Sequence, residues 1–266
     1  MKSFFKGSLA LAAPLLLAST ANAQWADLEF TVVFDGKAPE SEMLDVNAKD
    51  KCDAPAGGIP VEKLIVNPEN NGIANVVFTI DTRGTKLKPA QIHPDLQAVP
   101  TEKVVLDNLK CQFIPHVLSA RVGQKIEVKN SDSVPHNANF SFFSNKGVNP
   151  VIPAGGSVDI VTTEAERAAT RVDCNIHPWM TAYIMVYDHP YTGISDKDGK
   201  IVIKNLPANT PIAFKIWHES QDKSIEEVTV GGKKESWKRG VTEITLKEGK
   251  NDLGNVSIKS DRFKVK

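Results

Sequence analysis

Three side chains that bind soft metal ions lie within the short stretch CNIHPWM, residues 174–180. Cys174 supplies a thiolate, His177 an imidazole and Met180 a thioether. Two histidines and one cysteine in a trigonal set, with a weak axial methionine, form mononuclear copper sites that transfer electrons. The stretch therefore predicts three ligands of such a site, and a second histidine must come from another part of the chain.

The cysteine count supports this reading of Cys174. The chain has three cysteines, and in an exported protein an odd number leaves one thiol without a disulfide partner. Cys52 and Cys111 have no other metal-binding side chains close by, apart from His116 after Cys111. We therefore expect Cys52 and Cys111 to form a structural disulfide, which leaves Cys174 for a metal.

The identity of the metal and of the second histidine depends on the rest of the chain. Zinc also binds cysteine and histidine, but structural zinc prefers four strong ligands, and methionine is a poor fourth. Met180 therefore favours copper. Five histidines are candidates for the missing ligand: His93, His116, His136, His189 and His218.

The elements that must position these residues are mostly short β-strands. Alternating or continuous apolar runs predict strands, separated by turn residues, at 28–34, 75–81, 102–108, 116–122, 125–130, 139–143, 157–163, 170–174 and 183–188. Helical fragments are expected only around 41–48 and 164–169. Many short strands at this spacing predict an all-β protein, a β-sandwich with Greek-key connections.

One stretch and the ligand loop together resemble a known family. VGQKIEVKNSDSVPHNANF, residues 122–140, is followed later by C-x₂-H-P-x-M, and this combination resembles the cupredoxins, the type 1 blue-copper proteins. The resemblance covers at least residues 113–188, and the short loop is similar to that of amicyanin. It implies that one copper ion is bound by His136, Cys174, His177 and Met180, and that Asn137 supports the ligand loop.

The resemblance also implies how the site would be used. In the family the last histidine ligand reaches the surface through an apolar patch, which here would comprise His177, Pro178 and Trp179, with Val134 and Pro135 nearby. The expected activity is outer-sphere electron transfer with a periplasmic redox protein, a dehydrogenase or a c-type cytochrome. No enzymatic activity is expected, because the His-x-His and His-Cys-His elements of multicopper enzymes are missing. The alternative is a structural, sensing or delivery protein for copper.

The chain is longer than a single cupredoxin domain. The whole layout resembles larger cupredoxin-domain proteins of methylamine-utilisation contexts. After residue 189, a D-x-x-G turn (196–199), an apolar strand and an L-P-A-N turn (206–209) resemble the carboxypeptidase-regulatory-like, transthyretin-like β module. We therefore expect a cupredoxin-like domain at 24–188, with its core at about 104–188 after an N-terminal elaboration, and a smaller β-sandwich at 189–266.

The N-terminal residues and the charge balance indicate where the protein works. Residues 1–23 contain a basic start, a short apolar run and a small-x-small end, which predict a signal peptide cleaved between Ala23 and Gln24 and a periplasmic location. No later segment is long and apolar enough to predict a transmembrane helix. The 32 basic and 32 acidic residues balance, which argues against nucleic-acid binding.

Overall fold

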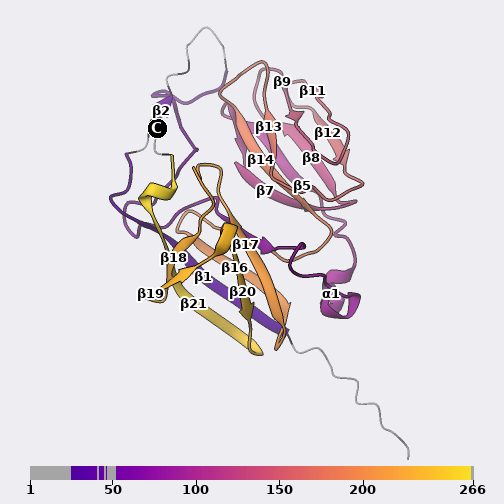
Figure 1. Ribbon diagram of the computed structural model, residues 1–266. Helices are drawn as coiled ribbons and strands as arrows, with labels where there is room; N and C mark the ends of the chain where they lie inside the picture. The colour runs from indigo at the N-terminus through magenta and orange to yellow at the C-terminus, as the bar shows by residue number, and fades with distance from the viewer. Residues whose placement is uncertain (1–24, 41, 45, 47–51, 265–266) are drawn as a thin grey trace, which may run out of the picture.

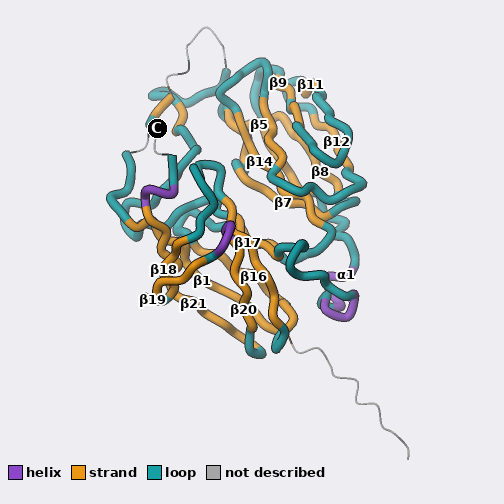
Figure 2. Tube along the Cα trace, in the orientation of Figure 1, coloured by secondary structure: helices purple, strands orange, loops and turns teal. Residues whose placement is uncertain are grey.

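The computed structural model describes residues 25–40, 42–44, 46 and 52–264, and these residues form two β-sandwiches (Figure 1). Strands and loops make up almost all of the described chain (Figure 2). The all-β prediction is therefore confirmed. The signal peptide predicted for residues 1–23 lies outside the described residues. Among the residues described, no helix has the length and apolar character needed to cross a membrane.

The first sandwich, which we call the inserted sandwich, holds the predicted ligands and lies at the upper right of Figure 1. Its two main sheets have the strand orders β12-β8-β5-β6 and β10-β13-β14-β7, and β9 pairs with β11 beside them. Its strands are β5 (Val104–Leu109), β6 (Gln112–Ile114), β7 (Val117–Arg121), β8 (Lys125–Asn130), β9 (His136–Asn137), β10 (Asn139–Phe140), β11 (Val151–Ile152), β12 (Ser157–Val161), β13 (Thr170–Asp173) and β14 (Thr181–Tyr187).

Strand β8 shows why these segments form sheets. Ile126 and Val128 alternate with Lys125 and Lys129, so one face of the strand is buried and the other meets solvent. The buried faces of the two sheets enclose one apolar core, which includes Cys174 and Met180. The ligand loop therefore starts and ends in a packed interior.

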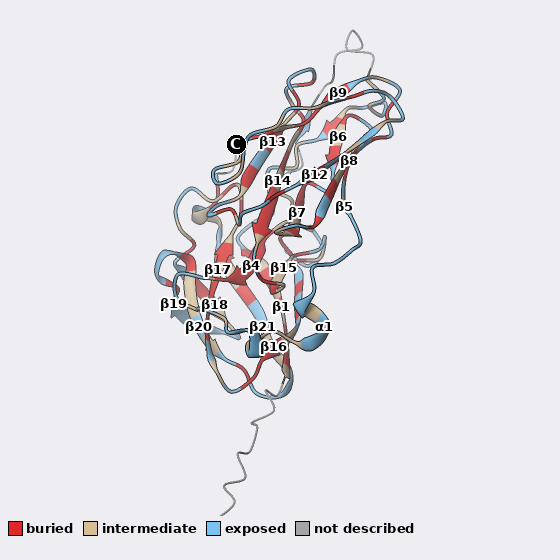
Figure 3. Ribbon diagram, turned by 90° about the vertical axis from the view of Figure 1, so that its right-hand side faces the viewer, coloured by how far each residue is buried: buried red, intermediate tan, exposed pale blue. Residues whose placement is uncertain are grey.

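The second sandwich, which we call the terminal sandwich, combines both ends of the described chain. Its sheets have the orders β16-β1-β21-β18-β19 and β15-β4-β17-β20, with a single core between them. Its strands are β1 (Trp25–Asp35), β4 (Val77–Ile80), β15 (Thr192–Ile194), β16 (Lys200–Pro207), β17 (Pro211–Trp217), β18 (Glu227–Val230), β19 (Lys233–Ser236), β20 (Val241–Thr245) and β21 (Gly249–Lys259). In Figure 3 the buried positions follow the strands of both sandwiches.

This arrangement corrects the predicted domain boundaries. Strands β1 and β4 lie inside the expected 24–188 domain, yet β1 pairs with β16 and β21, and β4 pairs with β15 and β17. The cause is the alternating pattern of β1, whose buried side chains, such as Leu28 and Phe30, pack in one core with Ile201 and Ile258. Residues 189–266 therefore share their sandwich with N-terminal strands, and the inserted sandwich interrupts it.

The connection from β1 to β4, which we call the arm, crosses from one sandwich to the other. It contains the short pair β2 (Met43–Leu44) and β3 (Ile59–Pro60), so the helix expected around 41–48 is not formed at β2. The helix expected at 164–169 is also wrong. There the carboxylate of Glu166 accepts hydrogen bonds from the backbone N–H groups of Phe143, Ser144 and Asn145, which fixes a loop. The described α-helix is α1 (Pro94–Gln97), in the linker after β4.

Contacts between described residues of the two sandwiches include an apolar cluster and an ion pair. Val77 of the terminal sandwich packs with Val117 and Met185 of the inserted sandwich, and Trp217 lies against this cluster. Beside it, His116 bonds to Glu219 after β17 and lies 3.4 Å from Glu62 of the arm. The inserted sandwich is thus held by apolar packing and by a buried charged cluster.

Candidate metal centre

The histidine at the start of β9 is held by a buried aspartate. His136 is completely buried, and its Nε2 donates to Oδ2 of Asp132 over 3.0 Å. Asp132 also accepts the backbone N–H groups of Lys110 at 2.5 Å and Cys111 at 2.9 Å, in the turn between β5 and β6. Because Asp132 engages Nε2, the lone pair of His136 lies on Nδ1, as in metal sites whose histidines are oriented by a carboxylate.

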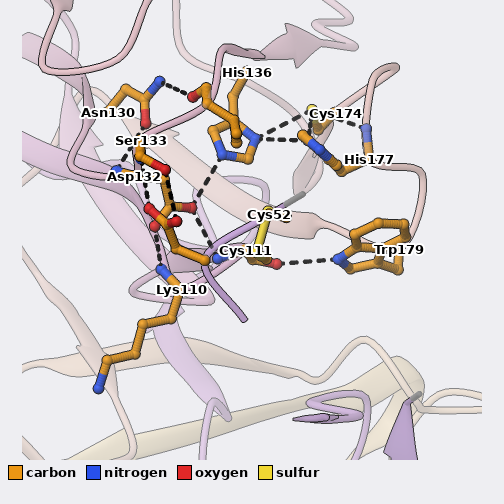
Figure 4. The surroundings of a disulfide bond; sticks show 12 residues. Cys52, Lys110, Cys111, Asn130, Asp132, Ser133, His136, Cys174, His177 and Trp179 are labelled. Atoms are coloured by element: carbon orange, nitrogen blue, oxygen red, sulfur yellow. Dashed lines mark hydrogen bonds and ion pairs between the residues drawn. A yellow bond between two sulfur atoms is a disulfide. The ribbon is translucent and has the colours of Figure 1, made fainter. Parts of the chain in front are cut away.

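Cys174 and His177 meet His136 at the end of the inserted sandwich. Nδ1 of His177 lies 2.9 Å from Nδ1 of His136, and Sγ of Cys174 lies 3.8 Å and 3.9 Å from these two nitrogens. His136 comes from β9, whereas the other two come from the loop between β13 and β14 (Figure 4). Three atoms that bind soft or borderline metals therefore point toward one another inside the protein.

Met180 closes the loop that carries these ligands. Its N–H donates to the carbonyl of His177 at 2.9 Å, and its carbonyl accepts the N–H of Cys174 at 3.2 Å. Its side chain is buried in the same core cluster as Cys174. The loop is thus a compact turn fixed at both ends.

Asn137 joins the ligand loop to β9. Its Oδ1 accepts the N–H groups of Asn175 at 2.8 Å and Ile176 at 3.2 Å, and lies 3.6 Å from Sγ of Cys174. Its Nδ2 donates to Asn149 at 2.5 Å. One buried amide therefore sets the distance between His136 and the loop.

The predicted disulfide is confirmed, and it lies next to the centre. Cys52 of the arm and Cys111 of the β5–β6 turn are bonded. Sγ of Cys52 is within 4.8 Å of a ring nitrogen of both His136 and His177. This proximity was not predicted, because residues 52 and 136 are far apart in the chain.

The three residues of the predicted surface patch differ in exposure. His177 is only 4% exposed, whereas the resemblance implied that it reaches the surface. Pro178 is exposed and Trp179 is half-buried, with its ring centroid 5.3 Å from that of His177. Sγ of Cys52, in the disulfide-bonded arm, lies within 4.8 Å of a ring nitrogen of His177.

The surroundings of His136 favour its neutral imidazole, the form that can bind a cation. Burial lowers the pKa of His136, and the neighbouring His177 lowers it further, against the opposing effect of Asp132. The neutral imidazole is therefore favoured near neutral pH, and a neutral imidazole is the form that binds metals.

The other histidines stand apart from the centre. Nδ1 of His189 accepts the N–H of Tyr191, and Nδ1 of His218 accepts the N–H of Ser220. His93 caps α1, and His116 lies in the charged cluster with Glu219 and Glu62. Each has a local partner that accounts for its position.

Solved structures of copper proteins match part of this chain. An amicyanin variant in its copper(I) form is 23% identical, with a TM-score of 0.29, and the match covers 32% of this chain and 81% of that one. A copper-containing nitrite reductase from Thermus scotoductus is 24% identical, with a TM-score of 0.31, over 39% of this chain and 27% of that one. A purple cupredoxin from Nitrosopumilus maritimus is 24% identical, with a TM-score of 0.27, over 32% of this chain and 97% of that one.

No family model and no curated protein sequence matches the chain. The donor set, two imidazole nitrogens and a thiol sulfur 2.9–3.9 Å apart and buried, fits a soft or borderline metal ion. Sequence reasoning missed Asp132, although its position four residues before His136, in the Asn-Ser-Asp segment, was a usable signal.

Proposed function

We propose that the protein binds one copper ion through His136, Cys174 and His177, with Met180 as a weak fourth ligand, and transfers single electrons. The observation that supports this most is the convergence of the two Nδ1 atoms and the thiol sulfur at one buried point. When bound, copper supplies a one-electron couple between its two oxidation states.

The chain's own contribution is to hold the ligands still. Asp132 fixes the orientation of His136, Asn137 fixes the loop, and both are buried and bonded to backbone groups. A packed interior resists rearrangement, so the ligands keep one arrangement in both oxidation states. Four protein ligands would leave no position for a substrate, and we therefore propose an electron carrier and not an enzyme.

The proposed location rests on the expected signal peptide, and the proposed partner rests on the resemblance to cupredoxins. The expected signal peptide supports export to the periplasm, where a dehydrogenase or a c-type cytochrome would be the redox partner. Trp179 is half-buried and Pro178 is exposed, and both follow His177 in the ligand loop. We propose that electrons are exchanged there, with the aromatic ring of Trp179 beside His177.

A copper-holding or delivery protein is the second candidate, favoured by one observation. His177 is only 4% exposed, and Sγ of Cys52 lies within 4.8 Å of one of its ring nitrogens, so little of this residue is open to a redox partner. A covered site suits slow metal exchange better than fast electron exchange.

The test is to add Cu(II) to purified apoprotein and record the visible spectrum. We expect an intense thiolate-to-copper band that Cys174→Ala abolishes and His93→Ala, a control outside the centre, retains. The lack of such a band in the unsubstituted protein would refute the copper site. Voltammetry then separates the two candidates: a reversible one-electron wave supports the carrier, whereas loss of copper on cycling supports the holding protein.

A further inference from the structure

The disulfide beside the centre brings a fourth strong metal-binding group into reach. Three atoms lie within 4.8 Å of one another: Sγ of Cys52, one ring nitrogen of His136 and one ring nitrogen of His177. Cys174 approaches the same two histidines from the ligand loop at 3.8 Å and 3.9 Å (Figure 4). Two sulfur atoms therefore flank one pair of imidazoles.

The other end of the disulfide is linked to the same histidine through Asp132. Oδ2 of Asp132 accepts both the N–H of Cys111, at 2.9 Å, and Nε2–H of His136, at 3.0 Å. The turn that carries Cys111 and the imidazole of His136 are thus held by one buried carboxylate. A change at the disulfide acts directly on the surroundings of the centre.

The arm is also held at this place by a contact that does not involve sulfur. The carboxylate of Asp53 accepts the N–H of Ser133 at 2.5 Å and its hydroxyl at 2.7 Å. Ser133 lies three residues before His136, in the same segment as Asp132. Cys52 would therefore stay near the histidines after the disulfide is opened.

Opening the disulfide changes the ligands available. A sulfur atom in a disulfide is not a thiolate, whereas a reduced cysteine is a strong ligand for zinc and copper(I). A dithiol reductant attacks one sulfur and its second thiol completes the exchange, so that the reductant becomes a disulfide while Cys52 and Cys111 gain two electrons and two protons. The thiol of Cys52 loses its proton when it binds a metal.

We propose that the Cys52–Cys111 disulfide is a redox-controlled part of the metal centre, and that its reduction recruits Cys52 as a second thiolate ligand beside His136, Cys174 and His177. With the disulfide intact the centre has one thiolate and suits copper. With it reduced, the centre offers two thiolates and two imidazoles, the closed set that zinc and copper(I) prefer. This inference rests on the proposed metal site and names its regulation.

The experiment uses Co²⁺ as a spectroscopic probe of the full-length mature protein, before and after reduction by a phosphine. Thiol counting establishes one thiol before reduction and three after. Because the thiolate ligands would rise from one to two, we expect the thiolate-to-cobalt absorbance per bound cobalt to rise about twofold. Circular dichroism confirms that the reduced protein is folded.

Two single variants provide a matched pair, because each removes the same disulfide. Cys111→Ser leaves the thiol of Cys52, and we expect the two-thiolate spectrum without reductant. Cys52→Ser leaves the thiol of Cys111, and we expect the one-thiolate spectrum. Equal spectra from the two variants, or no change when the wild-type protein is reduced, would overturn the inference.

The same data separate this inference from the proposed function. If oxidised protein shows no cobalt–thiolate band that depends on Cys174, the proposed metal site itself fails. If the band is present in oxidised protein and reduction leaves it unchanged, the metal site stands and only the role of Cys52 is refuted.

Discussion

The buried charged cluster between the sandwiches makes a specific prediction about alkaline pH. Burial by itself would lower the pKa of His116, but hydrogen bonds and charges from Glu219 and Glu62 outweigh it and raise the pKa to about 9. The imidazolium is therefore the favoured form in the folded protein. In the unfolded chain the pKa returns to its ordinary value near 6.5.

The sign of the effect on stability follows from these two values. Below pH 6.5 both states hold the proton, and the full contribution of His116 to folding is present. Between pH 6.5 and 9 the folded state binds the proton and the unfolded state does not, so stability falls by about 1.4 kcal/mol per pH unit. The total loss by pH 9 is about 3 kcal/mol, and no further loss comes from this group at higher pH.

The assay is urea unfolding followed by tryptophan fluorescence at several pH values from 6 to 9.5, with an NMR titration of His116. Glu219→Gln removes one carboxylate and leaves Glu62 at 3.4 Å, so the loss of stability with pH should become clearly smaller. Glu127→Gln, which breaks a surface pair with Lys103, is the control and should keep the wild-type dependence. An identical dependence in Glu219→Gln, or a His116 that titrates near 6.5, would refute the reasoning.

Three further predictions concern acid pH, the ligand loop and a strand turn. Burial lowers the pKa of both His189 and His218 to about 4. The unfolded chain therefore binds protons that the folded protein does not, and stability should fall as pH drops from 6.5 toward 4. His218→Gln removes one of these two groups and should remove about half of their joint loss in acid unfolding curves. Asn137→Ala should cost about 2 kcal/mol in chemical unfolding, and an unchanged midpoint would contradict its role in holding the loop. Gly199 has a φ of +81°, and a Cβ there would lie 2.4 Å from the carbonyl oxygen of Val32. Gly123 has a similar φ of +83° but open space around it. Gly199→Ala should therefore lower the thermal midpoint much more than Gly123→Ala.

Features set by local sequence were predictable. The alternation in residues 125–130 predicted β8 with its observed bounds, and the odd cysteine count led to the Cys52–Cys111 disulfide. The stretch 174–180 predicted a metal-binding loop, because it places a thiol, an imidazole and a thioether within seven residues. Each of these features depends on residues close in sequence or on the number of cysteines.

Features that depend on distant pairing were not predictable from one sequence. The pattern of β1 identified a strand, but nothing in it indicated that the strand runs parallel to β21, more than two hundred residues later. The segment between β1 and β4 has no regular apolar period in its sequence, so the approach of Cys52 to His177 could not be derived. The burial of His177 was likewise not predicted.

Both structural units of the protein contribute residues to the candidate metal centre and its surroundings. The inserted sandwich supplies His136, Cys174 and His177, together with Asp132 and Asn137 that position them. Cys52 and Asp53 of the arm, whose ends lie in the terminal sandwich, reach this region through the disulfide and through Ser133. The centre therefore combines residues of one unit with contacts from a segment that belongs to the other. The Cys52–Cys111 disulfide is the covalent part of that contact, and a reductant can open it.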